Sequence, residues 1–94
     1  MESNKENTEA FMDLAGKIKK TGVLSEKFKE LIAVSLAVKA QCEDCIIHHL
    51  KELIELKATD EEINEAIWVA VMMGGGPSLV YLMKAQKILK ELRK

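Results

Sequence analysis

The sequence predicts an all-α protein of about five helices, and three observations support this fold class. Strand signals are nearly absent, because no turn dipeptide is flanked by alternating apolar and polar residues. Apolar residues recur instead at helical spacing over most of the chain. The segments between these stretches carry capping residues, glycines and the single proline, Pro77, which are typical of helix boundaries.

Two helices are expected before the cysteines, over about residues 8–20 and 26–40. The first carries apolar side chains at helical spacing: Phe11, Leu14, Ala15 and Ile18. Ser25 can cap the second, whose middle, residues 31–38, is apolar almost all round. A helix of that kind is buried on more than one side.

Three more helices are expected, from about residue 42 to 56, from Thr59 to about 73 and from about 78 to 92. Thr59 and Glu62 have the spacing of a capping box. Residues 66–73 show no polar face, so this stretch either lies in the core or meets another subunit, and both roles are open.

The glycines of residues 74–76, followed by Pro77, break the chain before the last helix. Glycines permit a close approach of two backbones or unusual dihedral angles. Proline suits the first turn of the helix that follows. We therefore expect a tight connection between the last two helices.

The chain has 94 residues, which predicts one domain spanning residues 1–94. A chain of this length buries only roughly 60–65% of its unfolded surface, so a core of its own would be marginal. Apolar residues nevertheless make up 48% of the sequence. A small bundle of this composition often completes its core by oligomerising, and we expect a homo-oligomer.

Charge and hydropathy argue against two classes of partner. The formal net charge is −1, which gives no electrostatic case for nucleic acid or an anionic membrane surface. No signal peptide and no run of about 18 apolar residues is present, so a cytoplasmic protein is expected. Cytosolic thiols are kept reduced, and a cysteine pair there indicates catalysis or metal binding rather than a structural bridge.

The chemistry is expected in the segment Cys42-Glu43-Asp44-Cys45-Ile46-Ile47-His48-His49. At about 100° per residue, Cys45 lies about 60° from Cys42 on a helical wheel, and His49 lies about 20° from Cys42. The two thiols and His49 therefore share one face of a helix. His48 falls about 120° away from Cys42, which predicts a surface or packing residue.

This arrangement suits thiol redox chemistry. A helix N-terminus stabilises the thiolate, which is the reactive form of cysteine. Three residues of helical spacing allow Cys42 and Cys45 to oxidise to a disulfide. His49 lies one turn after Cys45 and can accept or relay its proton. The position of Cys42 at the helix end favours it as the more exposed thiol.

Metal binding is the main alternative. Cys42, Cys45 and His49 are three potential zinc ligands, with Glu30 or His48 as a fourth. Zinc-binding CxxC pairs usually lie in turns and are followed by a second Cys or His pair, and neither feature is present in this sequence.

Four segments resemble the carboxymuconolactone decarboxylase superfamily, and more closely its AhpD-like alkylhydroperoxidase branch. They are residues 29–34, 42–49, 58–66 and 73–77. The resemblance covers residues 22–92 and implies an all-α fold with an active site buried between helices. It also implies assembly into trimers or hexamers.

The resemblance implies catalytic roles for Glu30, Cys42, Cys45 and His49. Cys45 would be the attacking thiolate, prepared by proton transfers through His49 and Glu30, and Cys42 would close the disulfide. The residues themselves leave the reverse assignment of the two cysteines open. The AhpD branch has a histidine directly before its second cysteine, where this chain has Asp44. That part of the proton relay is absent or altered here.

The implied activity is reduction of a hydroperoxide through a Cys42/Cys45 dithiol–disulfide cycle, with a dithiol protein as reductant and no cofactor. A protein disulfide reductase or oxidoreductase would use the same two cysteines on another substrate. A zinc-binding or purely structural oligomerisation module is the alternative from another class.

Overall fold

The computed structural model describes residues 2–94 and confirms the all-α prediction. Five helices make up the described chain, and no strand occurs in it: α1 (Glu2–Lys19), α2 (Glu26–Lys39), α3 (Glu43–Glu55), α4 (Asp60–Gly74) and α5 (Gly76–Leu92). The four later helices lie within about two residues of their predicted bounds. The first begins six residues before the predicted start, because its polar opening residues have no apolar periodicity to reveal them.

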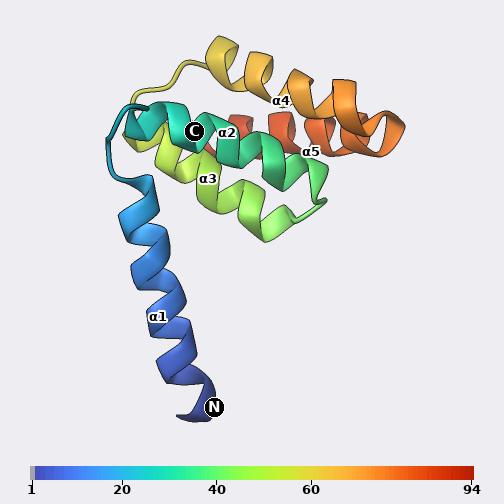
Figure 1. The fold of residues 1–94 in the computed structure, drawn as a ribbon. Coiled ribbons are helices and arrows are strands. Elements are labelled where there is room, and N and C mark those ends of the chain that lie inside the picture. The colour runs from blue at the N-terminus through green and yellow to red at the C-terminus, as the bar shows by residue number, and fades with distance from the viewer. Residues whose placement is uncertain (1) are drawn as a thin grey trace.

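Helices α2–α5 form the body of the molecule, and α1 extends away from it (Figure 1). α2 packs against α3, α4 and α5, as the apolar middle of its sequence predicted. The core consists of buried apolar side chains from these four helices and the turn before α4: Val34, Ala37, Val38, Ile46, Leu50, Leu53, Ala58, Ile63, Ile67, Ala70, Leu82, Ala85 and Leu89.

The apolar stretch of α4 is divided between the core and the surface. Ile67 and Ala70 are buried against the body, whereas Trp68, Val69 and Met72 are exposed. The stretch therefore supplies the core along one face only. Its other face is available for contact with another molecule.

The α4–α5 connection uses its glycines in both expected ways. Gly75 has φ 69°, a left-handed conformation that favours glycine. A Cβ atom at Gly74 would overlap the Oγ of Ser78 and lie 2.8 Å from Cδ of Lys39. The missing side chain thus lets the first turn of α5 approach the end of α4, with Pro77 in that turn.

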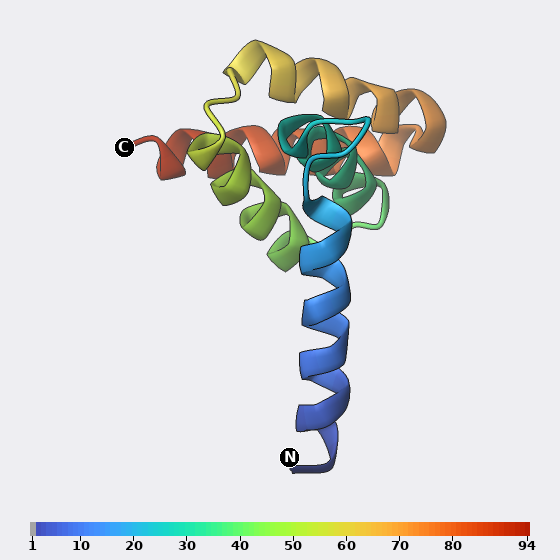
Figure 2. The same cartoon turned by 60° about the vertical axis from the view of Figure 1, so that its left-hand side comes forward.

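A second view shows α1 pointing away from the other helices along most of its length (Figure 2). Its contacts with the body are at its C-terminal end, where Lys29 Nζ donates to the carbonyl oxygens of Ile18 and Lys20 at 2.8 and 2.9 Å. Across residues 2–94, none of the helices has the length and apolar character needed to cross a membrane.

Candidate active site

The turn between α2 and α3 places Cys42. Gln41 adopts a left-handed conformation with φ 57°. Its N–H donates to the carbonyl of Val38, and the N–H of Cys42 donates to the carbonyl of Ala37. These are the two hydrogen bonds of a Schellman motif, which closes a helix within two residues. Cys42 therefore follows directly on the end of α2 and opens α3.

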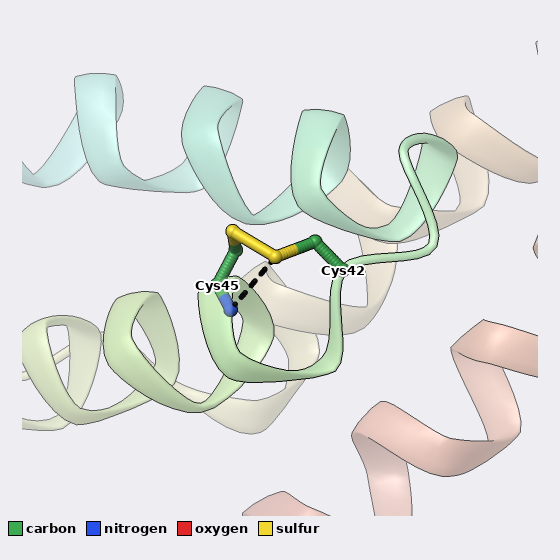
Figure 3. Close-up of a disulfide and its surroundings, with 2 residues drawn as sticks. All are labelled: Cys42 and Cys45. Carbon is green, nitrogen blue, oxygen red and sulfur yellow. Dashed lines mark hydrogen bonds between the residues drawn. A yellow bond between two sulfur atoms is a disulfide. The ribbon is translucent and has the colours of Figure 1, made fainter.

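Cys42 is the N-cap residue of α3, and its sulfur accepts a hydrogen bond from the N–H of Cys45 at 3.2 Å (Figure 3). The two cysteines form a disulfide with a Cα–Cα distance of 5.2 Å. Helical spacing predicted that the thiols could be bridged, and the disulfide confirms this. Ile46, the residue after Cys45, is fully buried and fixes this first turn of α3 on the core.

His49 and Glu30 meet across the α2–α3 interface. The Nδ1 atom of His49 lies 2.7 Å from Oε1 of Glu30. The Glu30 side chain is only 6% exposed, and that of His49 is 25% exposed. A buried carboxylate is costly unless it is paired, and His49 supplies the hydrogen-bond partner. A neutral imidazole that donates its Nδ1–H to this carboxylate has Nε2 left to accept a proton.

His49 also lies one helical turn after Cys45, so these two side chains are neighbours on α3. His48 is exposed, as predicted, and its ring meets the His49 ring edge-on at 5.0 Å between centroids. Only His49 of the two is paired with Glu30. The structure therefore brings the imidazole of α3 and the carboxylate of α2 together, one turn of α3 beyond Cys45.

The relative exposure of the two cysteines differs from the prediction. Within the single chain Cys45 is exposed and Cys42 is half-buried, so the expectation that Cys42 is the more exposed thiol was wrong. The reason is the Schellman turn, which holds Cys42 against the end of α2. The burial implied by the family resemblance is found in this chain for Glu30 and not for Cys45.

Sequence reasoning missed Lys19, which joins α1 to the helices of the site. Its Nζ lies 3.4 Å from Glu52 Oε2 of α3 and 3.8 Å from Glu26 Oε2 of α2. The hydrogen bond and charge of Glu52 raise the pKa of Lys19, and the carboxylates of Glu26 and Glu30 add to this rise. No local pattern marks this lysine, because its partner Glu52 is distant in sequence.

The zinc-binding alternative requires several ligand side chains close together. Throughout residues 2–94, no group of three or more His, Cys, Asp or Glu side chains is arranged to hold a metal ion.

Asp44, which stands where the AhpD branch has a histidine, is exposed in the first turn of α3 beside Glu43. Both carboxylates match the positive end of that helix dipole.

This chain is one of the small all-α proteins that have a CxxC disulfide at a helix N-terminus and a Glu–His pair beside it. The family model of the carboxymuconolactone decarboxylase family matches residues 5–87. This protein therefore belongs to the carboxymuconolactone decarboxylase family. The matched range begins within α1, upstream of residue 22, where the resemblance of the sequence begins.

Two solved structures of family members are close in fold. A protein from Legionella pneumophila, in its apo form, has a TM-score of 0.93 and 44% identity, over 99% of this chain and 83% of its own. A protein from Thermotoga maritima has a TM-score of 0.88 and 36% identity, over 95% of this chain and 92% of its own.

Two sequence relatives are similar over most of the chain, and both are uncharacterised. A protein from Cupriavidus necator is 38% identical over 81% of this chain and 67% of its own length. A protein from the cox locus of Paracoccus denitrificans is 39% identical over 89% of this chain and 76% of its own length. These relatives support the family without adding an activity.

Proposed function

We propose that this protein is a thiol-dependent oxidoreductase that reduces hydroperoxides through a Cys42/Cys45 dithiol–disulfide cycle. The observation that carries the proposal is the Cys42–Cys45 disulfide on the helix whose His49 is hydrogen-bonded to Glu30. Family membership is compatible with redox activity, and the related Thermotoga maritima protein is described in connection with an antioxidative response.

In the proposed cycle the Cys45 thiol loses its proton toward His49, whose imidazolium is stabilised by the Glu30 carboxylate. The thiolate attacks an oxygen of the hydroperoxide, the O–O bond breaks, and the alkoxide takes up the proton and leaves as an alcohol. Cys45 is then a sulfenic acid. The Cys42 thiol attacks this sulfur, the disulfide forms, and one water molecule is released.

A partner dithiol completes the cycle by exchange. Its thiolate attacks one sulfur of the disulfide, and the exposure of Cys45 supports attack at that atom. The leaving group is then the Cys42 thiolate, whose sulfur accepts the N–H of Cys45 at the helix N-terminus. The second partner thiol releases Cys45, and the partner leaves as a disulfide.

The exposed Cys45 also supports a second activity, which is disulfide exchange with another protein without any peroxide. The same two cysteines would take part, and His49 would serve the thiols in the same way. We further propose, from the exposed apolar face of α4 and the family resemblance, that the working form is a homo-oligomer such as a trimer or hexamer.

A stopped-flow assay with hydrogen peroxide and an alkyl hydroperoxide tests the peroxidase proposal. Cys45→Ser is expected to abolish peroxide consumption. Cys42→Ser is expected to permit one turnover that stops at a sulfenic acid on Cys45, detected by a sulfenic-acid reagent and mass spectrometry. His49→Gln is expected to slow the reaction about 100-fold, with His48→Gln as the matched control that stays near the wild-type rate.

The same variants are assayed for reduction of a model protein disulfide. Disulfide exchange without peroxide turnover would transfer the proposal to the second activity. Unreactive thiols together with about one zinc ion per chain in the purified reduced protein would overturn both redox activities in favour of a zinc module.

A further inference from the structure

α1 carries an exposed apolar stripe formed by Phe11, Leu14 and Ile18, which we call the α1 stripe. These three side chains are between 53% and 66% exposed. Their spacing of three and four residues places them on one face of the helix. Such a stripe is the sequence pattern of a helix that packs against another element, and no element of the described chain covers it.

α1 is held in a direction that keeps this stripe away from its own chain. Lys29 binds the carbonyl oxygens of Ile18, in the last turn of α1, and of Lys20, directly after it, and Lys19 binds Glu52 of α3. Both views show the rest of α1 leaving the body beyond this anchored end (Figures 1 and 2). The described part of this chain therefore leaves the α1 stripe open to a second molecule.

A groove that suits such a helix lies between α2 and α4. It has a volume of about 520 Å³ and includes Phe28, Ile32 and Leu36 on α2 and Ala66 and Val69 on α4. Four of these side chains are exposed apolar residues in the single chain: Phe28, Ile32, Leu36 and Val69. We call this surface the α2–α4 groove.

The groove and the thiol site are on opposite sides of α2. Glu30 lies about 160° around the helix from both Phe28 and Ile32. An occupant of the α2–α4 groove would therefore leave the Glu30–His49 pair uncovered.

The α1 stripe and the α2–α4 groove match in length. Seven residues separate Phe11 from Ile18, and seven separate Glu62 from Val69 along the groove, so each spans about 10 Å, or two helical turns. On α2 the groove is longer, from Lys27 to Leu36, or about 14 Å. The stripe therefore matches the α4 side of the groove and covers most of the α2 side.

Charges at the ends of the two surfaces are also complementary. The lining of the groove carries two carboxylates, Glu62 and Glu65, and one amine, Lys27, which is ion-paired with Glu62 at 2.9 Å near the start of both helices. In the last turn of α1, Lys19 is bound to Glu52 of its own chain, whereas Lys17 is exposed, with only Asp13 of the same helix 3.3 Å away. An α1 helix that lies antiparallel to α2 and α4 would place Lys17 at this acidic end.

We propose that α1 of one copy docks into the α2–α4 groove of a second copy, and that the exchange is reciprocal. Each copy has both surfaces, so a twofold axis would satisfy both stripes and both grooves at once. A twofold contact occurs in a hexamer of dihedral symmetry and not in a cyclic trimer. This inference therefore specifies a contact of the hexamer proposed above, and it does not depend on the thiol cycle.

Self-association measured by sedimentation velocity over a range of concentrations tests the contact from both sides. Leu14→Glu on α1 and Ile32→Glu in the groove are each expected to weaken association about tenfold or more. Glu9→Lys, on the polar face of α1, is the matched control with near-wild-type association. Both substituted side chains are exposed in the single chain, so we expect the variants to keep their helices. Circular dichroism checks this.

Cross-linking identifies which surfaces touch. In a Cys42→Ser/Cys45→Ser background, a chain with Leu14→Cys is mixed with a chain with Ile32→Cys under mild oxidation. The mixed cross-link is expected to dominate over both like-with-like products. A monomer at every concentration, unchanged association of Leu14→Glu, or cross-links only between two copies of Leu14→Cys would each overturn the proposal. Because this background cannot carry out thiol chemistry, its result is separate from that of the peroxidase assay.

Discussion

Glu30 shows how one buried charge can indicate a site. A carboxylate is rarely removed from water unless a partner compensates for the loss, and here the partner is the imidazole of His49 at 2.7 Å. The same imidazole lies one turn from Cys45 on α3. This arrangement is what the proton relay proposed above would use.

We predict that Glu30→Gln slows the reaction of the reduced protein with a hydroperoxide about 100-fold. The amide keeps a hydrogen bond to His49 but lacks the negative charge that stabilises the protonated imidazole. The measurement is the single-turnover rate of thiol oxidation. Glu26→Gln, one turn earlier on α2, removes a carboxylate that contacts Lys19 and serves as the control. Equal rates for the two variants would remove Glu30 from the relay.

Three of the helices begin on a side chain that accepts a backbone N–H. Ser25 caps α2 and Thr59 caps α4, and both are residue types that the N-cap position favours. Cys42 caps α3 although sulfur is a weak acceptor. The one departure from the capping rule falls at the proposed active site, which is where such departures are expected.

The capping box of α4 gives a prediction about pH. The N–H of Thr59 and, second, the amine of Lys27 lower the pKa of Glu62 below its ordinary value of 4.5. The folded protein therefore holds this proton less tightly than the unfolded chain. Its contribution to the free energy of unfolding is fully present above pH 4.5 and is lost as the pH falls through the lowered pKa.

Chemical denaturation at a series of pH values tests this contribution. Glu62→Gln keeps an acceptor for the Thr59 N–H but no charge, so it is expected to be less stable than the wild type at neutral pH and to approach it in acid. Glu61→Gln changes an exposed neighbour outside the capping box and should show no such convergence. A constant difference between wild type and Glu62→Gln at every pH would contradict the argument.

The residues that form the core of the molecule are different from the cysteines proposed to react. The buried core consists of apolar side chains from α2 to α5 and the turn before α4, and it contains neither cysteine. The disulfide joins residues only three positions apart and closes a short loop at the start of α3. A protein that cycles between dithiol and disulfide needs this separation, because its fold must survive both states.

We therefore predict that reduction leaves the helical circular dichroism spectrum unchanged and lowers the free energy of unfolding by at most about 2 kcal/mol, the chain-entropy value for a loop of this size. The measurement is denaturant unfolding with and without reductant. The Cys42→Ser/Cys45→Ser variant should not respond to reductant. Loss of helix on reduction would show that the bridge is structural and would argue against a cycling role.

Local patterns in the sequence determined the helices and one side of the site. Periodicity and caps located the helices, and the spacing of Cys42, Cys45 and His49 predicted their common face, because helical geometry relates residues a few positions apart. The start of α1 was missed for lack of an apolar pattern. The family resemblance, and not periodicity, indicated Glu30.

Contacts between residues that are distant in sequence could not be predicted from local patterns. The contact of Glu30 with His49, the link from Lys19 to Glu52, the greater exposure of Cys45 and the outward direction of α1 all depend on how α1, α2 and α3 pack against one another. Packing is fixed by many side chains acting together across the core, and no short window of sequence contains that information. Local sequence patterns thus indicate which groups could react, and packing sets which of them are neighbours and which are exposed.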